Sequence, residues 1–150
     1  MTRALVFLGV ALGVLIGVGA FTFIYARGAS YMTNDPRACV NCHIMREQFD
    51  GWVASSHRSV AVCNDCHAPH DFVGKYVTKA VNGFNHSFAF TTGRFPEQIL
   101  ITPRNRRVTE GACRSCHGDI VQAIDPSGVR GGHPQETECI RCHWGVGHLR

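Results

Sequence analysis

The chain begins with a long apolar run that predicts a membrane helix. No charged side chain occurs from residue 4 to residue 25, a stretch of 22 positions bounded by Arg3 and Arg27. As a helix, this run reaches about 33 Å, which is enough to cross the hydrocarbon core of a bilayer. It exceeds the roughly 7–15 apolar residues of an ordinary secretion signal, so we expect a retained anchor rather than a cleaved leader.

One face of this anchor consists of small residues. Gly9, Gly13 and Gly17 recur at every fourth position and therefore line one side of a helix. Such a stripe lets a second membrane helix approach closely. Glycine is also common in membrane helices generally, so self-association through the anchor and an unpaired anchor both stay open.

Residues 72–88 have the periodicity of an amphipathic helix. Apolar side chains recur there at helical spacing, whereas Lys75 and Lys79 fall on another face and His86 lies two turns beyond Lys79. A helix of this kind can lie at a membrane surface with its apolar side towards lipid. An Asn-Gly pair and a further Asn shortly before His86 weaken the helix propensity, so we expect the helix to end before His86.

Composition bounds the rest of the molecule. Much of the 45% apolar content sits in the anchor, so the remainder is poor in core-forming side chains and something else must fill its interior. The 15 basic and 11 acidic side chains leave a net charge of only +4, and no basic stripe with interleaved aromatics occurs, which excludes a nucleic-acid-binding protein. A short basic run at Arg104, Arg106 and Arg107 is expected in a solvated loop.

All eight cysteines belong to one motif, C-x-x-C-H, which occurs four times. Two thiols at this spacing reach the two vinyl groups of one porphyrin, and the histidine that follows offers its imidazole to the iron. Each motif therefore predicts one covalently bound haem c, four in all. The motif residues are Cys39, Cys42 and His43; Cys63, Cys66 and His67; Cys113, Cys116 and His117; and Cys139, Cys142 and His143.

Other uses of paired cysteines explain the pattern less well. Zinc ribbons, thioredoxin-like sites and extracytoplasmic disulfides all use such pairs. None of them requires a histidine after every pair. We therefore predict a mostly α-helical protein with extensive irregular structure, in which one N-terminal transmembrane anchor, residues 1–28, carries a compact multihaem cytochrome c domain, residues 29–150.

The haem domain has the pattern of two dihaem halves. The first and second motifs begin 24 positions apart, and the third and fourth begin 26 apart. Each half repeats the same placement of further histidines, which are candidates for the second axial position of each iron. They are His57 and His133, six residues before the second motif of each half, and His70 and His148, shortly after it. A histidine so close to its own motif does not reach across the same porphyrin, so the last two would bind a neighbouring haem.

The first motif has a competing iron ligand. Met45 follows His43 by two residues, and residues two apart on a helix point in nearly opposite directions, so both cannot bind one iron from the same side. The residues alone favour the histidine. A methionine ligand would raise the potential of the haem.

Together these features resemble the NapC/NirT family of membrane-bound tetrahaem quinol dehydrogenases. The resemblance rests on the anchor, the four motifs, the stretch C-V-N-C-H-I-M that ends at Met45 and the stretch C-N-D-C-H-A-P-H that ends at His70. Within the family, the short chain most resembles the small subunits of cytochrome c nitrite reductases in its length. The resemblance implies that Met45 binds the first iron and displaces His43, while the other three motif histidines, His67, His117 and His143, bind theirs.

The resemblance also implies an activity and a partner. Family members oxidise menaquinol from the membrane quinol pool and pass the electrons to a periplasmic reductase, here a pentahaem subunit that reduces nitrite to ammonium. This chain would then be the quinol-oxidising electron-transfer subunit of the complex and not the nitrite-reducing one. It would span the cytoplasmic membrane once, with its haem domain on the periplasmic side. A reductase for nitrate or an N-oxide in place of the nitrite reductase, or a passive anchored relay, are the alternatives.

The family places a lysine and, seven residues later, an aspartate at its quinol site. Lys79 matches the lysine, but His86 stands where the family has the aspartate. Histidine titrates near neutral pH, so His86 is a candidate acceptor of the quinol protons. Ligation of the first iron opposite Met45 is the other interpretation of His86, and both stay open.

Overall fold

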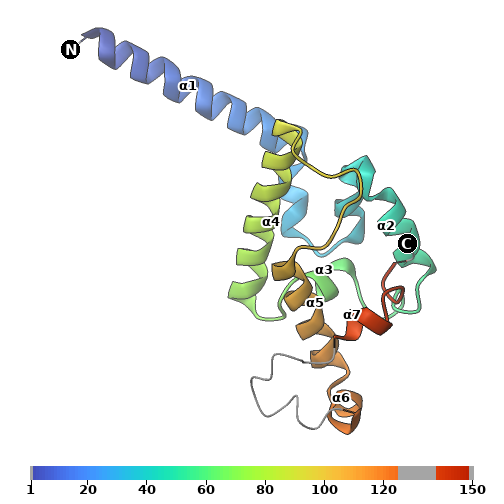
Figure 1. The fold of residues 1–150 in the computed structure, drawn as a ribbon. Helices are drawn as coiled ribbons and strands as arrows, with labels where there is room; N and C mark the ends of the chain where they lie inside the picture. Colours follow the sequence, from blue (N-terminus) through green and yellow to red (C-terminus); the bar gives the residue numbers. More distant parts are fainter. Residues whose placement is uncertain (1, 125–137, 149–150) are drawn as a thin grey trace. The chain divides into compact units, whose positions relative to one another are not determined.

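The computed structural model describes residues 2–124 and 138–148 (Figure 1). Within these ranges all regular secondary structure is helical and no strand occurs, which confirms the expected fold class. The chain divides into two compact units, Met1–Arg46 and Glu47–Arg150, and each is described by itself. The first haem-attachment motif belongs to the N-terminal unit and the other three to the second. The predicted boundary at residue 28, between anchor and haem domain, stays a prediction.

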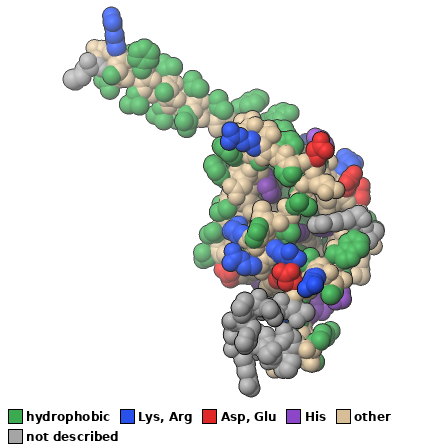
Figure 2. Space-filling model, viewed as in Figure 1, with side chains coloured by type: hydrophobic (Ala, Val, Ile, Leu, Met, Phe, Trp, Pro, Cys, Tyr) green, Lys and Arg blue, Asp and Glu red, His purple; other side chains and the backbone are tan. Residues whose placement is uncertain are grey.

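The N-terminal unit begins with the expected apolar helix. Helix α1 (Thr2–Tyr25) is long and apolar enough to cross a membrane. Its apolar side chains are exposed, and Figure 2 shows them along the helix. The helix ends where Arg27 adopts a left-handed backbone conformation at φ 50°, a conformation that commonly terminates helices.

Three short 3-10 helices follow and carry the first motif. They are η1 (Gly28–Met32), η2 (Pro36–Asn41) and η3 (His43–Met45). The Asp35 carboxylate accepts the backbone N–H of Arg37 at 2.9 Å and caps η2, and Pro36 occupies the first helical position, where its missing N–H costs nothing. Asn41 Nδ2 donates to Ser30 Oγ at 2.7 Å. This bond joins η2 to η1 and holds the motif against the segment that leaves α1.

The second unit contains the other three motifs on helices that pack together. Its helices are α2 (Arg46–Ala54, which starts at the unit boundary), α3 (Cys63–His67), α4 (Phe72–Thr92), α5 (Pro103–Cys116), α6 (Gly118–Ile124) and α7 (Cys139–Cys142). Helix α3 carries the second motif, α5 the cysteines of the third, and α7 those of the fourth. Both α3 and α7 pack against α5, the helix that carries the cysteines of the third motif (Figure 1).

Helix α4 is longer than its sequence suggested. The Asp71 carboxylate caps its start by accepting the Gly74 N–H at 2.7 Å, and Gly93, at φ 67°, ends it. The expectation that the helix ends before His86 was therefore wrong. Each Asn or Gly costs about 1 kcal/mol or less in a helix. The cap and side-chain contacts such as that between the Phe84 and Phe88 rings, whose centres are 6.1 Å apart, outweigh this cost.

Side chains do not fill the interior of the protein. Among the described residues, the buried apolar side chains are those of Ala68 and Ala112, and no large side chain is fully buried. A domain held by its own side chains would bury several large aliphatic and aromatic residues. The packing thus agrees with the inference from composition that another group supplies the apolar interior.

Candidate functional site

The cysteines are arranged for covalent attachment of a porphyrin. All eight lie among the described residues, and none forms a disulfide. In α3, Cys63 and Cys66 are three positions apart and therefore share one helix face. In the described ranges no three His, Cys, Asp or Glu side chains gather as a zinc site requires. The donor set present fits haem.

Three of the thiols lie in surroundings that disfavour the thiolate form. Burial raises the pKa of Cys66 and of Cys113 above the ordinary value for a thiol. Burial, together with a bond to Glu110, raises the pKa of Cys139 to about 11. Redox-active and nucleophilic cysteines have lowered pKa values, so this environment argues against a thioredoxin-like use of the pairs.

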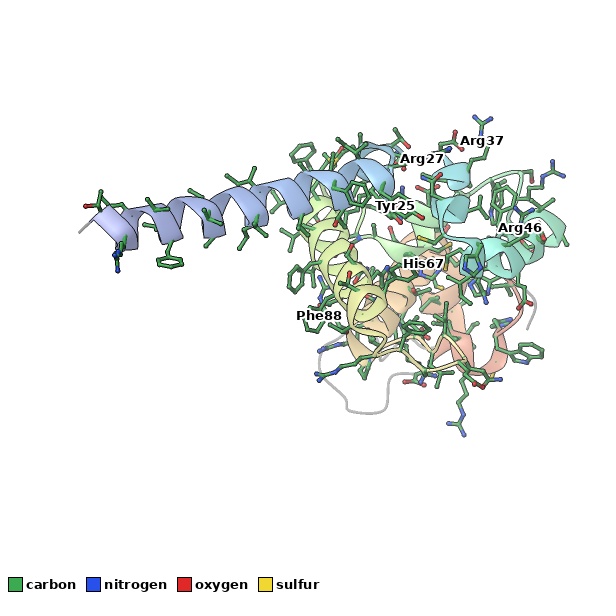
Figure 3. The ribbon with its side chains drawn as sticks, turned by 90° about the horizontal axis from the view of Figure 1, so that it is seen from above. Tyr25, Arg27, Arg37, Arg46, His67 and Phe88 are labelled. Atoms are coloured by element: carbon green, nitrogen blue, oxygen red, sulfur yellow. The ribbon has the colours of Figure 1, made fainter. Side chains whose placement is uncertain are left out.

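Two pairs of histidine rings lie close together in the second unit. His57 and His117 have ring centres 6.1 Å apart, and so do His67 and His148; His67 is labelled in Figure 3. Each pair joins the histidine of a haem-attachment motif to a histidine outside the motifs. The ring planes lie at 76° in the first pair and at 7° in the second.

The ring separation fits two ligands of one iron. A ring nitrogen lies about 2 Å from a metal that it binds and roughly 1 Å from its own ring centre, so two imidazoles on opposite sides of one iron have centres about 6 Å apart. Ordinary aromatic contacts also occur at about 4.5–7 Å, so the distance by itself does not identify a ligand pair. The pairing of a motif histidine with a non-motif one, twice, is what favours ligation.

The surroundings of His57 and His67 are compatible with binding to a metal. Ser56 Oγ lies 3.2 Å from His57 Nδ1, which leaves Nε2 of His57 for a metal. Protein atoms packed around the His67 ring lower its pKa, and His148 adds to this effect, although the residue as a whole is exposed. An imidazole must be neutral to bind iron.

His70 is placed differently from His148. Its Nε2 donates to the carbonyl oxygen of Asp65 at 2.9 Å, and its Nδ1 accepts from Ser115 Oγ at 3.3 Å. Because both ring nitrogens are engaged, His70 links the second motif to the third. The sequence did not reveal this difference, because His70 and His148 each follow the second motif of their half of the chain. His143 is exposed, and His133, the remaining candidate, lies outside the described residues.

The first motif, in the N-terminal unit, separates the two competing ligands. His43 is exposed and Met45 is half-buried, and the 3-10 geometry of η3 directs the two side chains to different sides. Tyr31 Oη lies 3.6 Å from Cys42 Sγ. Burial and this contact raise the pKa of Tyr31 to about 12, so the phenol stays protonated. Nothing in the sequence pattern pointed to Tyr31.

Lys79 and His86 share one face of α4. They are seven residues apart on a continuous helix, which is nearly two full turns. Lys79 Nζ lies 5.8 Å from the ring centre of Tyr76. His86 is exposed, but neighbouring protein atoms partly desolvate its ring and lower its pKa. The neutral form of His86, which can accept a proton, is therefore favoured near pH 7.

The basic run is part of a helix and not a solvated loop. Arg104 donates from its two terminal nitrogens to Asn82 Oδ1 and Thr78 Oγ1, each at 3.4 Å, and thereby joins α5 to α4. Arg106 pairs with Glu138 at 2.9 Å. The loop interpretation was wrong because Thr102 caps α5 and Pro103 starts it, signals of a helix start that precede the arginines.

Comparisons with known proteins place these features in context. The family model of the NapC/NirT cytochrome c family, N-terminal region, matches residues 1–150. The cytochrome c-type protein NrfH of Wolinella succinogenes is 35% identical, with 89% of this chain and 80% of that protein covered. The cytochrome c nitrite reductase subunit NrfH of Nitratidesulfovibrio vulgaris is 30% identical over 92% of this chain and 81% of that protein.

A solved structure is similar as well. One chain in the crystal structure of the cytochrome c nitrite reductase NrfHA complex bound to the inhibitor HQNO superimposes with a TM-score of 0.66 and 28% identity. The match covers 94% of this chain and 90% of that one.

Proposed function

This chain belongs to the NapC/NirT cytochrome c family, and we propose that it oxidises menaquinol at the membrane and supplies the electrons to a periplasmic nitrite reductase. The family match and the relatives support covalently bound haem c. The apolar helix α1, together with the family match, supports a single-pass membrane protein. The observation that carries the proposal is the packing of α3 and α7 on α5, which sets three haem-attachment motifs side by side.

Each group of ligands has a stated role in this proposal. When bound, haem supplies reversible one-electron transfer at its iron. The paired cysteines of the four motifs anchor the porphyrins. In the second unit, His67 and His148 bind the second iron, and His117 and His57 bind the third.

The first and fourth haems have ligands of other kinds. Met45, half-buried beside the exposed His43, binds the first iron in this proposal. His143 would hold the fourth iron, with His133 as the candidate second ligand. His70, through its two hydrogen bonds, orients the second and third motifs and binds no iron.

The quinol site uses the shared face of α4. The Lys79 ammonium is a hydrogen-bond donor that orients a quinol oxygen, and neutral His86 two turns away accepts a proton from a quinol hydroxyl. A quinol loses two protons with its two electrons, so exposed His86 takes up one proton at a time and returns it to solvent, while the electrons pass to the haems. The lowered pKa of His86 supports this role and not that of a fixed cation.

The nitrite reductase partner is proposed from the relatives. Two are subunits named NrfH, and the similar solved chain belongs to an NrfHA complex. The haem domain then faces the periplasm, because covalent haem attachment in c-type cytochromes takes place outside the cytoplasmic membrane.

The test uses the purified full-length protein in lipid vesicles. A water-soluble menaquinol analogue is added anaerobically, and the absorbance of reduced c-type haem is followed. We expect all four haems to be reduced and the reduction to slow when the Lys79 side chain is removed. A passive relay would show no quinol-driven reduction, although a small-molecule reductant would still reduce the haems.

A further inference from the structure

Glu110 makes a two-pronged contact between the third and fourth haem-attachment motifs. It lies on α5, three residues before Cys113. Its Oε2 accepts the backbone N–H of Cys139 at 2.8 Å, and its Oε1 accepts that of Ile140 at 2.9 Å. Both carboxylate oxygens are thus used by the first two residues of α7.

This contact supplies what the start of α7 lacks locally. The first N–H groups of a helix have no partner within the helix, and Glu138, at the N-cap position, makes no side-chain cap bond. Glu110 satisfies two of these donors from another helix. Bonds to an ionised carboxylate are stronger than neutral ones, and two parallel bonds fix orientation as well as distance.

A second contact reinforces the first. Arg106, one turn earlier on α5, pairs with Glu138 at 2.9 Å. The two side chains therefore hold the start of α7 to α5 at consecutive turns. Cys113 lies three residues after Glu110, on the same helix face. The Glu110 carboxylate therefore lies between Cys113 and Cys139, which are attachment residues of two successive haems.

We propose that Glu110 is a positioning residue that sets the placement of the fourth haem-attachment motif relative to the third, and that its negative charge holds down the reduction potential of the haems attached there. An anion near an iron favours the more positively charged oxidised state. The inference rests on the proposed function only in that the motifs carry haem.

The test compares two substitutions at Glu110 in the full-length haem-loaded protein. Glu110→Gln keeps the side-chain length but removes the charge and one acceptor. Glu110→Asp keeps the charge but shortens the reach. Glu97→Gln, in an exposed segment after α4, is the matched charge-removal control. Each protein is analysed by intact mass for bound haem, by potentiometric titration, and by electron paramagnetic resonance (EPR) for coupling between neighbouring haems.

We expect four haems in every variant, because attachment is covalent. Glu110→Gln should raise at least one potential, and both Glu110 variants should change the EPR coupling, whereas Glu97→Gln should match the parent. Potentials and coupling unchanged in Glu110→Gln would overturn the inference. If that variant does not accumulate, the EPR coupling of Glu110→Asp decides in the same way. If quinol fails to reduce a parent protein that carries all four haems, the proposed function is wrong. The effect of Glu110 on potentials and coupling can still be measured in that case.

Discussion

Removal of the His148 ring provides a sharp prediction of the ligand assignment. In His148→Ala the second iron keeps His67 and loses the ligand on its other side, because the two ring centres are 6.1 Å apart and His70 has both nitrogens engaged. A haem that loses a strong axial ligand changes from low spin to high spin. The substitution should therefore convert one haem without loss of any attachment cysteine.

The size of the change follows from the number of motifs. With four motifs in the chain, one converted haem is about one quarter of the total haem signal. The EPR spectrum of the oxidised full-length protein measures this increment against the spectrum of the parent. Added imidazole should restore the low-spin signal, because the small ligand can occupy the position that His148 leaves.

Two companion variants make the prediction refutable. His57→Ala removes the partner of His117 and should give an increment of the same size. His70→Ala should leave the spin state unchanged, because its ring nitrogens bind Asp65 and Ser115. If His70→Ala converts a haem and His148→Ala does not, the assignment is wrong and His70 is the ligand.

Further predictions concern α4. Lys79→Met should slow quinol oxidation roughly 10- to 150-fold, because a hydrogen bond to a charged group contributes about 1.5–3 kcal/mol. Lys75→Met, one turn earlier, should have a small effect. Equal effects of the two substitutions would argue against a specific role of Lys79. The pKa of His86 is lowered below 6.5. The quinol oxidation rate should therefore stay constant as the pH falls to 6.5 and decline at lower pH, where the ring takes up a proton. If His86→Gln shows the same decline, His86 is not the proton acceptor. Asp71→Ala removes the cap bond to Gly74 and should destabilise α4 by about 1 kcal/mol. Circular dichroism should then show a lower urea midpoint of unfolding. An unchanged midpoint would show that the cap contributes nothing.

The sequence predicted the features that depend on local spacing. The anchor follows from an uncharged run, and the haem motifs from cysteines three positions apart, because both properties are fixed within one or two helical turns. The start of α4 at Phe72 agrees in the same way with the amphipathic pattern over residues 72–88. Its extension past His86 did not, because stabilising contacts outweighed weak local propensity.

Features that depend on distant residues could not be predicted. His70 and His148 occupy equivalent places in the two sequence halves, yet one bonds to Ser115 and the other faces His67. The partner of His148 is 81 positions away in the chain (148 − 67), a distance at which periodicity carries no information. Glu110 likewise acts on a backbone that the chain reaches only after α6.

The proposed function requires that electrons move from quinol through this chain to a nitrite-reducing partner. The most direct measurement follows the haems of the full-length protein in vesicles, first reduced by a menaquinol analogue and then mixed with a pentahaem nitrite reductase. We predict that nitrite then reoxidises the haems and ammonium forms in proportion to the quinol consumed. Haems that stay reduced with nitrite but are reoxidised through a nitrate or N-oxide reductase would contradict the proposed partner, and haems that quinol never reduces would contradict the function itself.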